Sequence, residues 1–152
     1  MFYGSILLLL ILDLVSKSKM ETLPLNQAFK VIPGWLSWKL IHNPGASFGI
    51  LSESTPFLTA VSAVSIFVLF YLYEKNNTKS LLLKVGFAFV ISGAAGNFIN
   101  RIWLGYVIDF IDFRWWPAIF NVADIEIRTG SILLLFLFVL KRDRRHTVGR
   151  TG

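Results

Sequence analysis

Four of the nine acidic residues lie in one short segment, GAAGNFINRIWLGYVIDFIDFRWWPAIFNVADIEI, at residues 93–127. They are Asp109, Asp112, Asp124 and Glu126, and long apolar runs flank the segment on both sides. Carboxylates packed against membrane-spanning stretches are costly to ionise, so they need a partner or a function. If folding brings Asp109 and Asp124 face to face, one keeps a proton while the other ionises. Such a pair could activate water for peptide hydrolysis, as aspartic proteases do.

Each acid also has a purely structural interpretation. Asn121 could cap a helix that begins after it, with Asp124 at the third helical position, as in a capping box. Asp109 and Asp112, three residues apart, could instead form an exposed acidic patch with Arg101 as counter-ion. The functional interpretation is favoured by three further polar residues that fall at the same predicted membrane edge, namely Asn97, Arg101 and Asn121.

The composition is that of a membrane protein. Hydrophobic residues make up 55% of the 152 positions and charged residues 16%, which departs from soluble domains in both respects. The length fits one domain, residues 1–152, and the absence of cysteine excludes disulfides and thiol catalysis. The net charge of +6 could suggest a nucleic-acid partner, but cations cluster in the tail KRDRRHTVGR at residues 141–150. A basic flank beside an apolar run is typical of a cytoplasmic membrane edge, so no nucleic acid is expected.

Apolar runs predict four transmembrane helices. The first, FYGSILLLLILDLV, could be mistaken for a secretory signal peptide, but it lacks a basic start and a small-residue cleavage site. Extended through Ser18 it is long enough to span, with Lys17 and Lys19 reaching the interface. A proline opens the second run, and small residues close the third, where another helix or a substrate backbone could approach. The predicted spans cover residues 2–18, 56–73, 81–98 and 123–140.

Between the first two spans, residues 19–55 do not fit a helix. Prolines and glycines punctuate them, and the alternating stretch WLSWKLIH, residues 35–42, predicts β-strands. HNPGASFGI, residues 42–50, predicts a turn or loop. We therefore expect an integral membrane, mainly α-helical fold with a small extracytoplasmic β-cradle. Cations divide almost equally between the two sides, and the dense basic tail, residues 141–152, places both termini in the cytoplasm. Residues 19–55 and 99–122 are then extracytoplasmic.

The chemistry open to the remaining residues is narrow. Asp13, in the first predicted span, could form an ion pair with Lys17 four residues on, or could support an active site. The only histidines are His42 and His146, and no HExxH helix or glycine-rich phosphate loop occurs. Neither a metal nor a cofactor is therefore expected. A dyad of Ser16 and Lys17 is disfavoured, because adjacent helix residues do not face each other.

Four motifs, taken together and in this order, resemble those of one family. They are DLVSK at residues 13–17, NPGASFGI at 43–50, GNFINRI with GYVIDF at 96–110, and FNVAD at 120–124. In this combination the chain resembles the bacterial lipoprotein signal peptidases, also called signal peptidase II or prolipoprotein signal peptidases. The family pattern has an aspartate just before the arginine of its third motif, where this sequence has Asn100.

The resemblance implies an intramembrane aspartic endopeptidase of the bacterial inner membrane, with its active site at the periplasmic face. It would cut the signal peptide from a prolipoprotein just before a cysteine that carries diacylglycerol. Membrane lipids are the other expected partners, and we expect a monomer. By the same resemblance, Asp109 and Asp124 are the catalytic pair. The residues that would line or support the site are Asp13, Lys17, Asn43, Gly45, Asn97, Arg101, Asn121 and Ala123.

Two other classes of function remain open from the residues alone. Intramembrane acids also mark proton pathways, so the chain could be a small proton-coupled transporter or channel subunit. Against this, Asp109 and Asp124 fall at one predicted membrane edge, and the sequence offers no second set of acids toward the inner side. A non-enzymatic membrane partner subunit is the third class, and it predicts that carboxylate-to-amide changes leave the phenotype intact.

Overall fold

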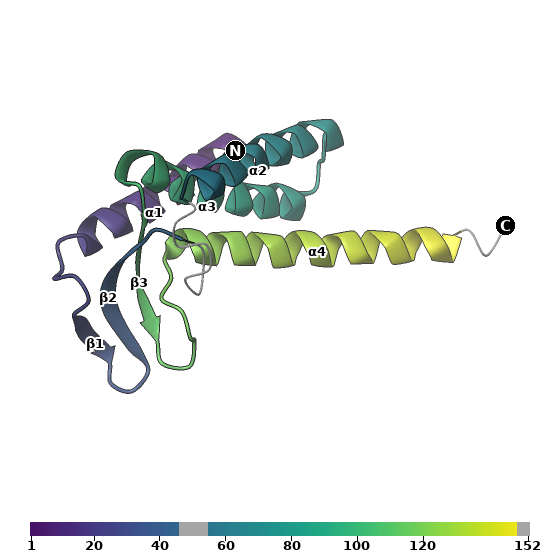
Figure 1. Ribbon diagram of the computed structural model, residues 1–152. Coiled ribbons are helices and arrows are strands. Elements are labelled where there is room, and N and C mark those ends of the chain that lie inside the picture. Colours follow the sequence, from purple (N-terminus) through teal and green to yellow (C-terminus); the bar gives the residue numbers. More distant parts are fainter. Residues whose placement is uncertain (46–54, 149–152) are drawn as a thin grey trace.

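The computed structural model describes residues 1–45 and 55–148, with side chains up to residue 140. Within these residues the chain forms four helices and a three-stranded sheet, as Figure 1 shows. The predicted mainly helical fold with a small sheet is therefore confirmed. In chain order the elements are α1 (Phe2–Met20), β1 (Ala28–Ile32), β2 (Leu36–Asn43), α2 (Thr55–Asn76), α3 (Leu81–Leu104), β3 (Val107–Phe113) and α4 (Val122–Val148).

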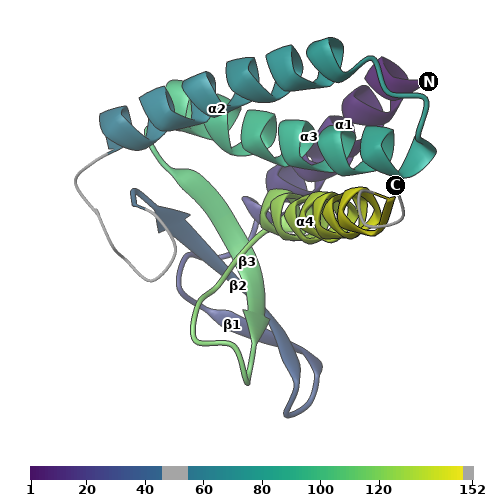
Figure 2. The same cartoon turned by 90° about the vertical axis from the view of Figure 1, so that its right-hand side faces the viewer.

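The sheet is built from two segments that lie far apart in the sequence. β1 and β2 form an antiparallel hairpin, and Gly34 takes a positive φ of 78° at its turn. β3 follows only after two helices, yet it pairs antiparallel with β2, so that Asn43 lies opposite Val107 and Ile41 opposite Asp109. In Figure 2, where α4 points toward the viewer, the sheet lies below the helices. The strand pairing therefore places β3, which follows α3, beside β2 and brings Val107 next to the end of β2.

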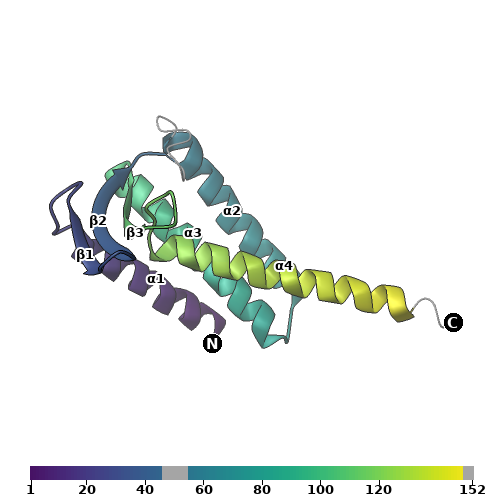
Figure 3. The same ribbon diagram turned by 90° about the horizontal axis from the view of Figure 1, so that it is seen from below.

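Helix α3 is the centre of the helical part. It contacts α1, α2 and α4, and Figure 3 shows it running between α1 and α2. Small residues permit this close approach. A side chain at Gly93 would collide with the backbone of Ala123 on α4, and one at Gly96 with the carboxylate of Asp13 on α1. The close approach that the sequence predicts at the end of the third span is therefore confirmed.

The outer surfaces of the helices are strongly apolar. Helix α2 has no buried residue, and it exposes Phe57 to 58%, Val64 to 62% and Phe67 to 73%. Exposed apolar surface of this extent is unusual for a soluble domain and suits contact with lipid. Within the described residues, α2 and α3 are long and apolar enough to cross a membrane. They coincide with the second and third predicted spans, while the spans predicted for α1 and α4 stay predictions.

The helices run past the predicted spans. Helix α3 continues to Leu104, through residues 99–104 that the sequence assigns to the extracytoplasmic segment, and ends where Gly105 adopts a positive φ of 79°. Helix α4 likewise continues through Val148, beyond the apolar run. The bounds differ because a fall in hydropathy marks the edge of an apolar surface, not the end of the backbone hydrogen bonding. In the predicted loop at 42–50, His42 and Asn43 instead complete β2, and residues 46–54 lie outside the described part of the chain.

Candidate active site

Asp109 lies on β3 with its side chain only 3% exposed. Two side-chain amides hold its carboxyl group: Asn43 Nδ2 donates to Oδ2 at 2.8 Å, and Asn121 Nδ2 donates to Oδ1 at 2.6 Å. Asp112, three residues on, is only partly buried and does not share the buried position of Asp109. The alternative that these two acids form one exposed patch is therefore wrong.

Asp124 lies in the first turn of α4, where the sequence predicts a capping box, and the hydrogen bonds confirm it. The backbone N–H of Asp124 donates to Asn121 Oδ1 at 3.0 Å, and the backbone N–H of Asn121 donates to Asp124 Oδ2 at 3.2 Å. The positive end of the helix dipole also favours a carboxylate here. Asn121 thus uses its oxygen to cap α4 and its amide nitrogen to bind Asp109. Because Asn121 contacts both acids, the capping role of Asp124 is compatible with a place in the same site as Asp109.

A second amide, that of Asn97 on α3, completes the network. Its Nδ2 donates to Asp124 Oδ1 at 3.0 Å, and its Oδ1 accepts hydrogen bonds from Lys17 Nζ at 2.9 Å and Asn121 Nδ2 at 3.2 Å. The amide cannot turn over, because its nitrogen would then face two donors. The orientation of Asn97, and with it the hydrogen bond to Asp124, is therefore determined by Lys17 and Asn121.

Lys17 and Asp13 form an ion pair on α1, with 2.7 Å between Nζ and Oδ2 and side chains 1% and 0% exposed. The predicted pair at i, i+4 is therefore confirmed. The other oxygen of Asp13 accepts a hydrogen bond from the backbone N–H of Ala123 at 2.9 Å, which ties α1 to the start of α4. Because Lys17 also binds Asn97, the ion pair belongs to the same network as the two acids.

Arg101 extends from α3 over the same site. Its Nη2 donates to the carbonyl oxygen of Gly45 at 3.3 Å, while its Nε is buried and has no hydrogen-bond partner among the described residues. Gly45 is itself held, because its backbone N–H donates to Asn43 Oδ1 at 3.0 Å. The guanidinium group thus keeps donor capacity for a ligand.

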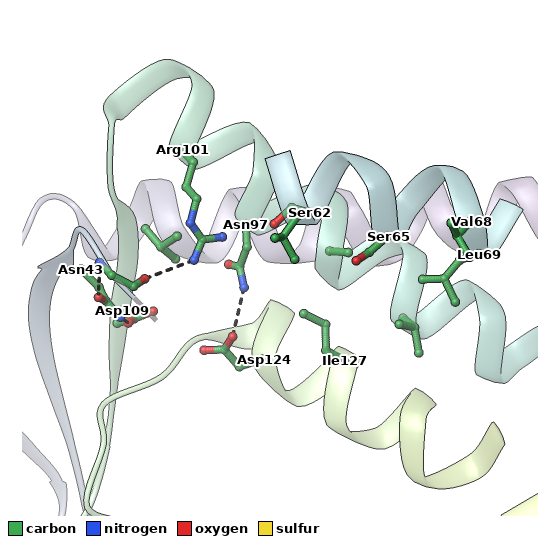
Figure 4. Close-up of a pocket in the computed structure, with 15 residues that line it drawn as sticks. Asn43, Ser62, Ser65, Val68, Leu69, Asn97, Arg101, Asp109, Asp124 and Ile127 are labelled. Atoms are coloured by element: carbon green, nitrogen blue, oxygen red, sulfur yellow. Dashed lines mark hydrogen bonds between the residues drawn. The ribbon is translucent and has the colours of Figure 1, made fainter. Parts of the chain in front are cut away.

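Both acids line one cavity of about 520 Å³. Figure 4 shows Arg101 and Asn97 pointing from α3 toward Asp124 on α4, with Asp109 and Asn43 beside them. The rest of the lining is apolar apart from two serines of α2, so the cavity is polar at one end and apolar along its length. These other lining residues are Gly45, Val61, Ser62, Ser65, Val68, Leu69, Val90, Ala94, Val107 and Ile127.

Burial, together with the neighbouring carboxylate of Asp124, raises the pKa of Asp109 from 3.8 to about 7. The amides of Asn43 and Asn121 and the ammonium group of Lys17 act in the opposite direction, because they stabilise the ionised form. Burial prevails. A carboxyl group with a pKa near neutrality can hold a proton at rest and release it during a reaction.

All ten site residues predicted from the sequence lie in or beside this network. Sequence analysis missed Ser62 and Ser65 of α2, whose only signal was a pair of hydroxyls three residues apart in an apolar run. It assigned no role to Asn100, which it noted only as a departure from the family pattern, or to Glu126, which it counted among the four acids; these residues are 6% and 3% exposed. Both oxygens of Glu126 and the hydroxyl of Ser92 lack a hydrogen-bond partner in the described part of the chain.

Comparisons with known proteins agree with this geometry. The sequence model for signal peptidase (SPase) II matches residues 5–140. The chain is 38% identical over 149 residues to a lipoprotein signal peptidase of Syntrophomonas wolfei, covering 95% of this chain and 98% of that one. For a lipoprotein signal peptidase of Clostridium tetani the identity is 37% over 143 residues, covering 91% of each chain. A solved bacterial membrane enzyme, determined by the in meso method, superposes with a TM-score of 0.89 at 30% identity, covering 94% of this chain and 90% of the other.

Proposed function

The chain belongs to the signal peptidase II family, and from that premise we propose that Asp109 and Asp124 are its catalytic acid–base pair. As a member of this family it is a membrane-bound peptidase that removes signal peptides from prolipoproteins. The alternatives of a transporter and of a partner subunit do not account for this family membership. One observation carries the assignment of the pair. Asn121 binds the carboxyl group of Asp109 and caps the helical turn that holds Asp124, and both acids line one cavity.

In the proposed mechanism Asp109 is the general acid and Asp124 the general base. The pKa of about 7 keeps a proton on Asp109 in mildly acidic solution. Ionised Asp124 takes a proton from water as the water oxygen attacks the scissile carbonyl carbon, and Asp109 gives its proton to the carbonyl oxygen. When the C–N bond breaks, Asp124 protonates the leaving amine and Asp109 recovers a proton from a hydroxyl of the intermediate. The pair thus ends with the single proton it started with.

The hydrogen bonds support this mechanism by fixing both carboxyl groups before substrate binds. Asn43 and Asn121 each bind one oxygen of Asp109. Asn97 and the backbone N–H of Asn121 each bind one oxygen of Asp124. Groups held in this way need little rearrangement during the reaction, which is the main advantage of a preorganised site.

The substrate that suits this cavity has an apolar segment and one polar bond to be cut. We infer that it is a prolipoprotein whose cysteine carries diacylglycerol, cleaved just before that cysteine. The apolar wall formed by α2 can contact the signal segment while the acyl chains stay in the bilayer. The guanidinium group of Arg101 lines the cavity and has N–H donors beyond the one that binds Gly45, which could donate to a carbonyl or ester oxygen of the substrate.

We further infer that all four helices span the inner membrane and that residues 1–152 form one monomeric domain. The charges of α1 do not oppose this, because Asp13 and Lys17 pair with each other and are almost completely buried. Lipid would meet the exposed apolar side chains of α1 and α4, which include Leu8, Leu12, Ile132, Leu135 and Phe138. The basic tail after α4 favours the cytoplasm for both termini, which puts the sheet and the two acids on the periplasmic side.

The deciding experiment incubates purified protein in detergent with a diacylglyceryl-modified prolipoprotein and measures the product masses. The wild-type protein should release the signal peptide and a fragment that begins with the lipidated cysteine. Asp109→Asn and Asp124→Asn should each abolish cleavage, because an amide can neither take a proton from water nor return one. The double variant should be no worse than either single, since the acids act as one unit.

Melting temperatures of the same variants separate catalysis from capping. If Asp124 only caps α4, Asp124→Asn should lower the free energy of unfolding by roughly 0.5–2 kcal/mol and leave turnover intact. Cleavage by Asp124→Asn above about a tenth of the normal rate, a barrier change below roughly 1.4 kcal/mol, would overturn the proposed pair.

A further inference from the structure

Asn100 is buried on α3 beside Arg101, but it is not among the residues that line the cavity. Its Oδ1 accepts a hydrogen bond from the backbone N–H of Ile108 on β3 at 3.3 Å. Because a backbone N–H can only donate, the oxygen of the Asn100 amide must be the atom that faces it. Ile108 directly precedes Asp109, so this contact reaches the backbone next to the general acid.

The N–H of Ile108 points to the edge of β3 that β2 does not cover. On the β2 side, Ile108 lies opposite His42. Alternate residues of a strand direct their N–H groups to the same edge, and the next such group, that of Phe110, donates to the carbonyl oxygen of Phe120 at 3.1 Å. The side chain of Asn100 therefore supplies to Ile108 the acceptor that the backbone of Phe120 supplies to Phe110. Without it this buried N–H would be left unpaired, which is costly.

We propose that Asn100 is a positioning residue, whose acceptor oxygen fixes the backbone at Ile108 and thereby the carboxyl group of Asp109. The inference rests on the proposed catalytic role of Asp109. It gains support from Asn97, which lies three residues earlier on the same side of α3 and binds Asp124. One face of α3 therefore binds both acids or their surroundings. Asn97 donates to the carboxyl group of Asp124, and Asn100 accepts from the backbone of β3 next to Asp109. Helix α3 sets the position of each acid relative to the other.

Two substitutions at Asn100 separate the acceptor from the rest of the side chain. Asn100→Leu keeps a similar volume and removes the acceptor, so kcat should fall roughly 10- to 100-fold, as expected for a displaced catalytic group, with KM changed less than about 2-fold. Asn100→Asp restores an acceptor oxygen at the same distance from the backbone, and kcat at its best pH should return to within about 3-fold of wild type. Asn100→Ala serves as the second acceptor-free variant if Asn100→Leu does not accumulate as folded protein.

Hydrogen exchange at the Ile108 amide, measured by NMR on the detergent-solubilised protein, provides a readout that does not depend on activity. Exchange should accelerate in Asn100→Leu and stay slow in Asn100→Asp. Ser92→Ala is the matched control, because Ser92 is a buried polar residue of α3 that lies beside Glu126 and does not line the cavity, and both kcat and exchange should be unchanged.

The proposal is overturned if Ile108 exchange in the acceptor-free variants equals that of wild type, if their kcat is unchanged, or if Asn100→Asp is as impaired as they are. Failure of the proposed function looks different. Turnover would then survive in Asp109→Asn, while the exchange measurement would still report whether Asn100 holds the strand.

Discussion

Two groups of buried or partly buried polar side chains lie near the start of α4, and they differ in how their hydrogen-bonding groups are satisfied. In the active site, the amides of Asn97 and Asn121 and the carboxyl groups of Asp109 and Asp124 are all hydrogen-bonded. Glu126 is buried too, but its only polar neighbour of this kind within the described residues is the hydroxyl of Ser92, and neither of its oxygens makes a hydrogen bond of good geometry. Glu126 lies two residues from Asp124 on α4, which turns it to the other side of the helix.

The difference shows what buried polarity contributes in each place. A fully satisfied network is strengthened by its low-dielectric surroundings and holds each group in one orientation. An unsatisfied group in the same surroundings costs stability and fixes no geometry. The hydrogen-bonded acids and amides of the candidate active site therefore combine polarity with order, whereas for Glu126 the cost dominates. Substitutions in the two regions should consequently change stability in opposite directions.

The largest effect should follow from removing a charge from the satisfied network. Lys17→Met leaves Asp13 buried without its counter-ion, which should lower the free energy of unfolding by about 3–5 kcal/mol. It also deprives Asn97 Oδ1 of one donor, so turnover should fall as well. Thermal unfolding in detergent and the cleavage assay measure the two effects.

The double variant Asp13→Asn/Lys17→Met serves as the control for this prediction. It removes both charges and keeps an oxygen for the Ala123 N–H, so much of the lost stability should return. If the double variant is no more stable than Lys17→Met, the unpaired charge is not the cause of the loss.

A smaller change to the same network concerns its dependence on pH. The pKa of Asp109 is raised from 3.8 to about 7, so cleavage should fall as the pH rises through about 7 and the general acid loses its proton. Asn43→Ala removes a donor that favours the ionised form, so the falling limb should move to higher pH. Normalised pH–rate profiles of the two proteins test this, and a shift of that limb to lower pH would contradict the assignment of Asp109 as the acid.

The unsatisfied group should respond in the opposite sense. Glu126→Leu removes a buried carboxyl group that has no partner in the described part of the chain, so the free energy of unfolding should rise by about 1–3 kcal/mol. Turnover should change little, because Glu126 does not line the cavity. A melting temperature below that of the wild type would mean that the carboxyl group is satisfied in the native protein.

The smallest effect is expected outside both groups. Asp112 lies opposite Ser37 on β2, and it is not among the residues that line the cavity. Asp112→Asn should therefore keep cleavage near the wild-type rate and change the free energy of unfolding by less than about 0.5 kcal/mol. Complete loss of cleavage at a normal protein level would instead assign the general acid to Asp112.

The parts of the site that depend on local spacing could be predicted from the sequence. The ion pair of Asp13 with Lys17 and the capping box of Asn121 with Asp124 both follow from helical geometry over three or four residues. The apolar runs likewise located the helices, though not their ends. These features need no knowledge of the rest of the chain.

The contacts between distant parts of the chain could not be predicted from local spacing, and only the family resemblance indicated which distant residues share the site. Asp109 reaches the site because β3 pairs with β2, which puts Asn43, 66 residues away, in contact with it. The same strand pairing leaves the Ile108 N–H exposed to Asn100, and neither residue type indicates that contact. The burial of Glu126 also depends on helix packing, because a carboxyl group in the first turns of a helix ordinarily indicates exposure.

The shared role of Asn121 bears on how this enzyme could escape an inhibitor. A compound that binds both carboxyl groups would contact a residue that also starts α4, so resistance mutations at Asn121 would weaken the helix and the catalyst together. Resistance should instead arise on the apolar wall formed by α2, where Val68 and Leu69 line the cavity without joining the polar network. Compounds that draw their affinity from the acids and little from this wall should therefore select resistant variants more slowly.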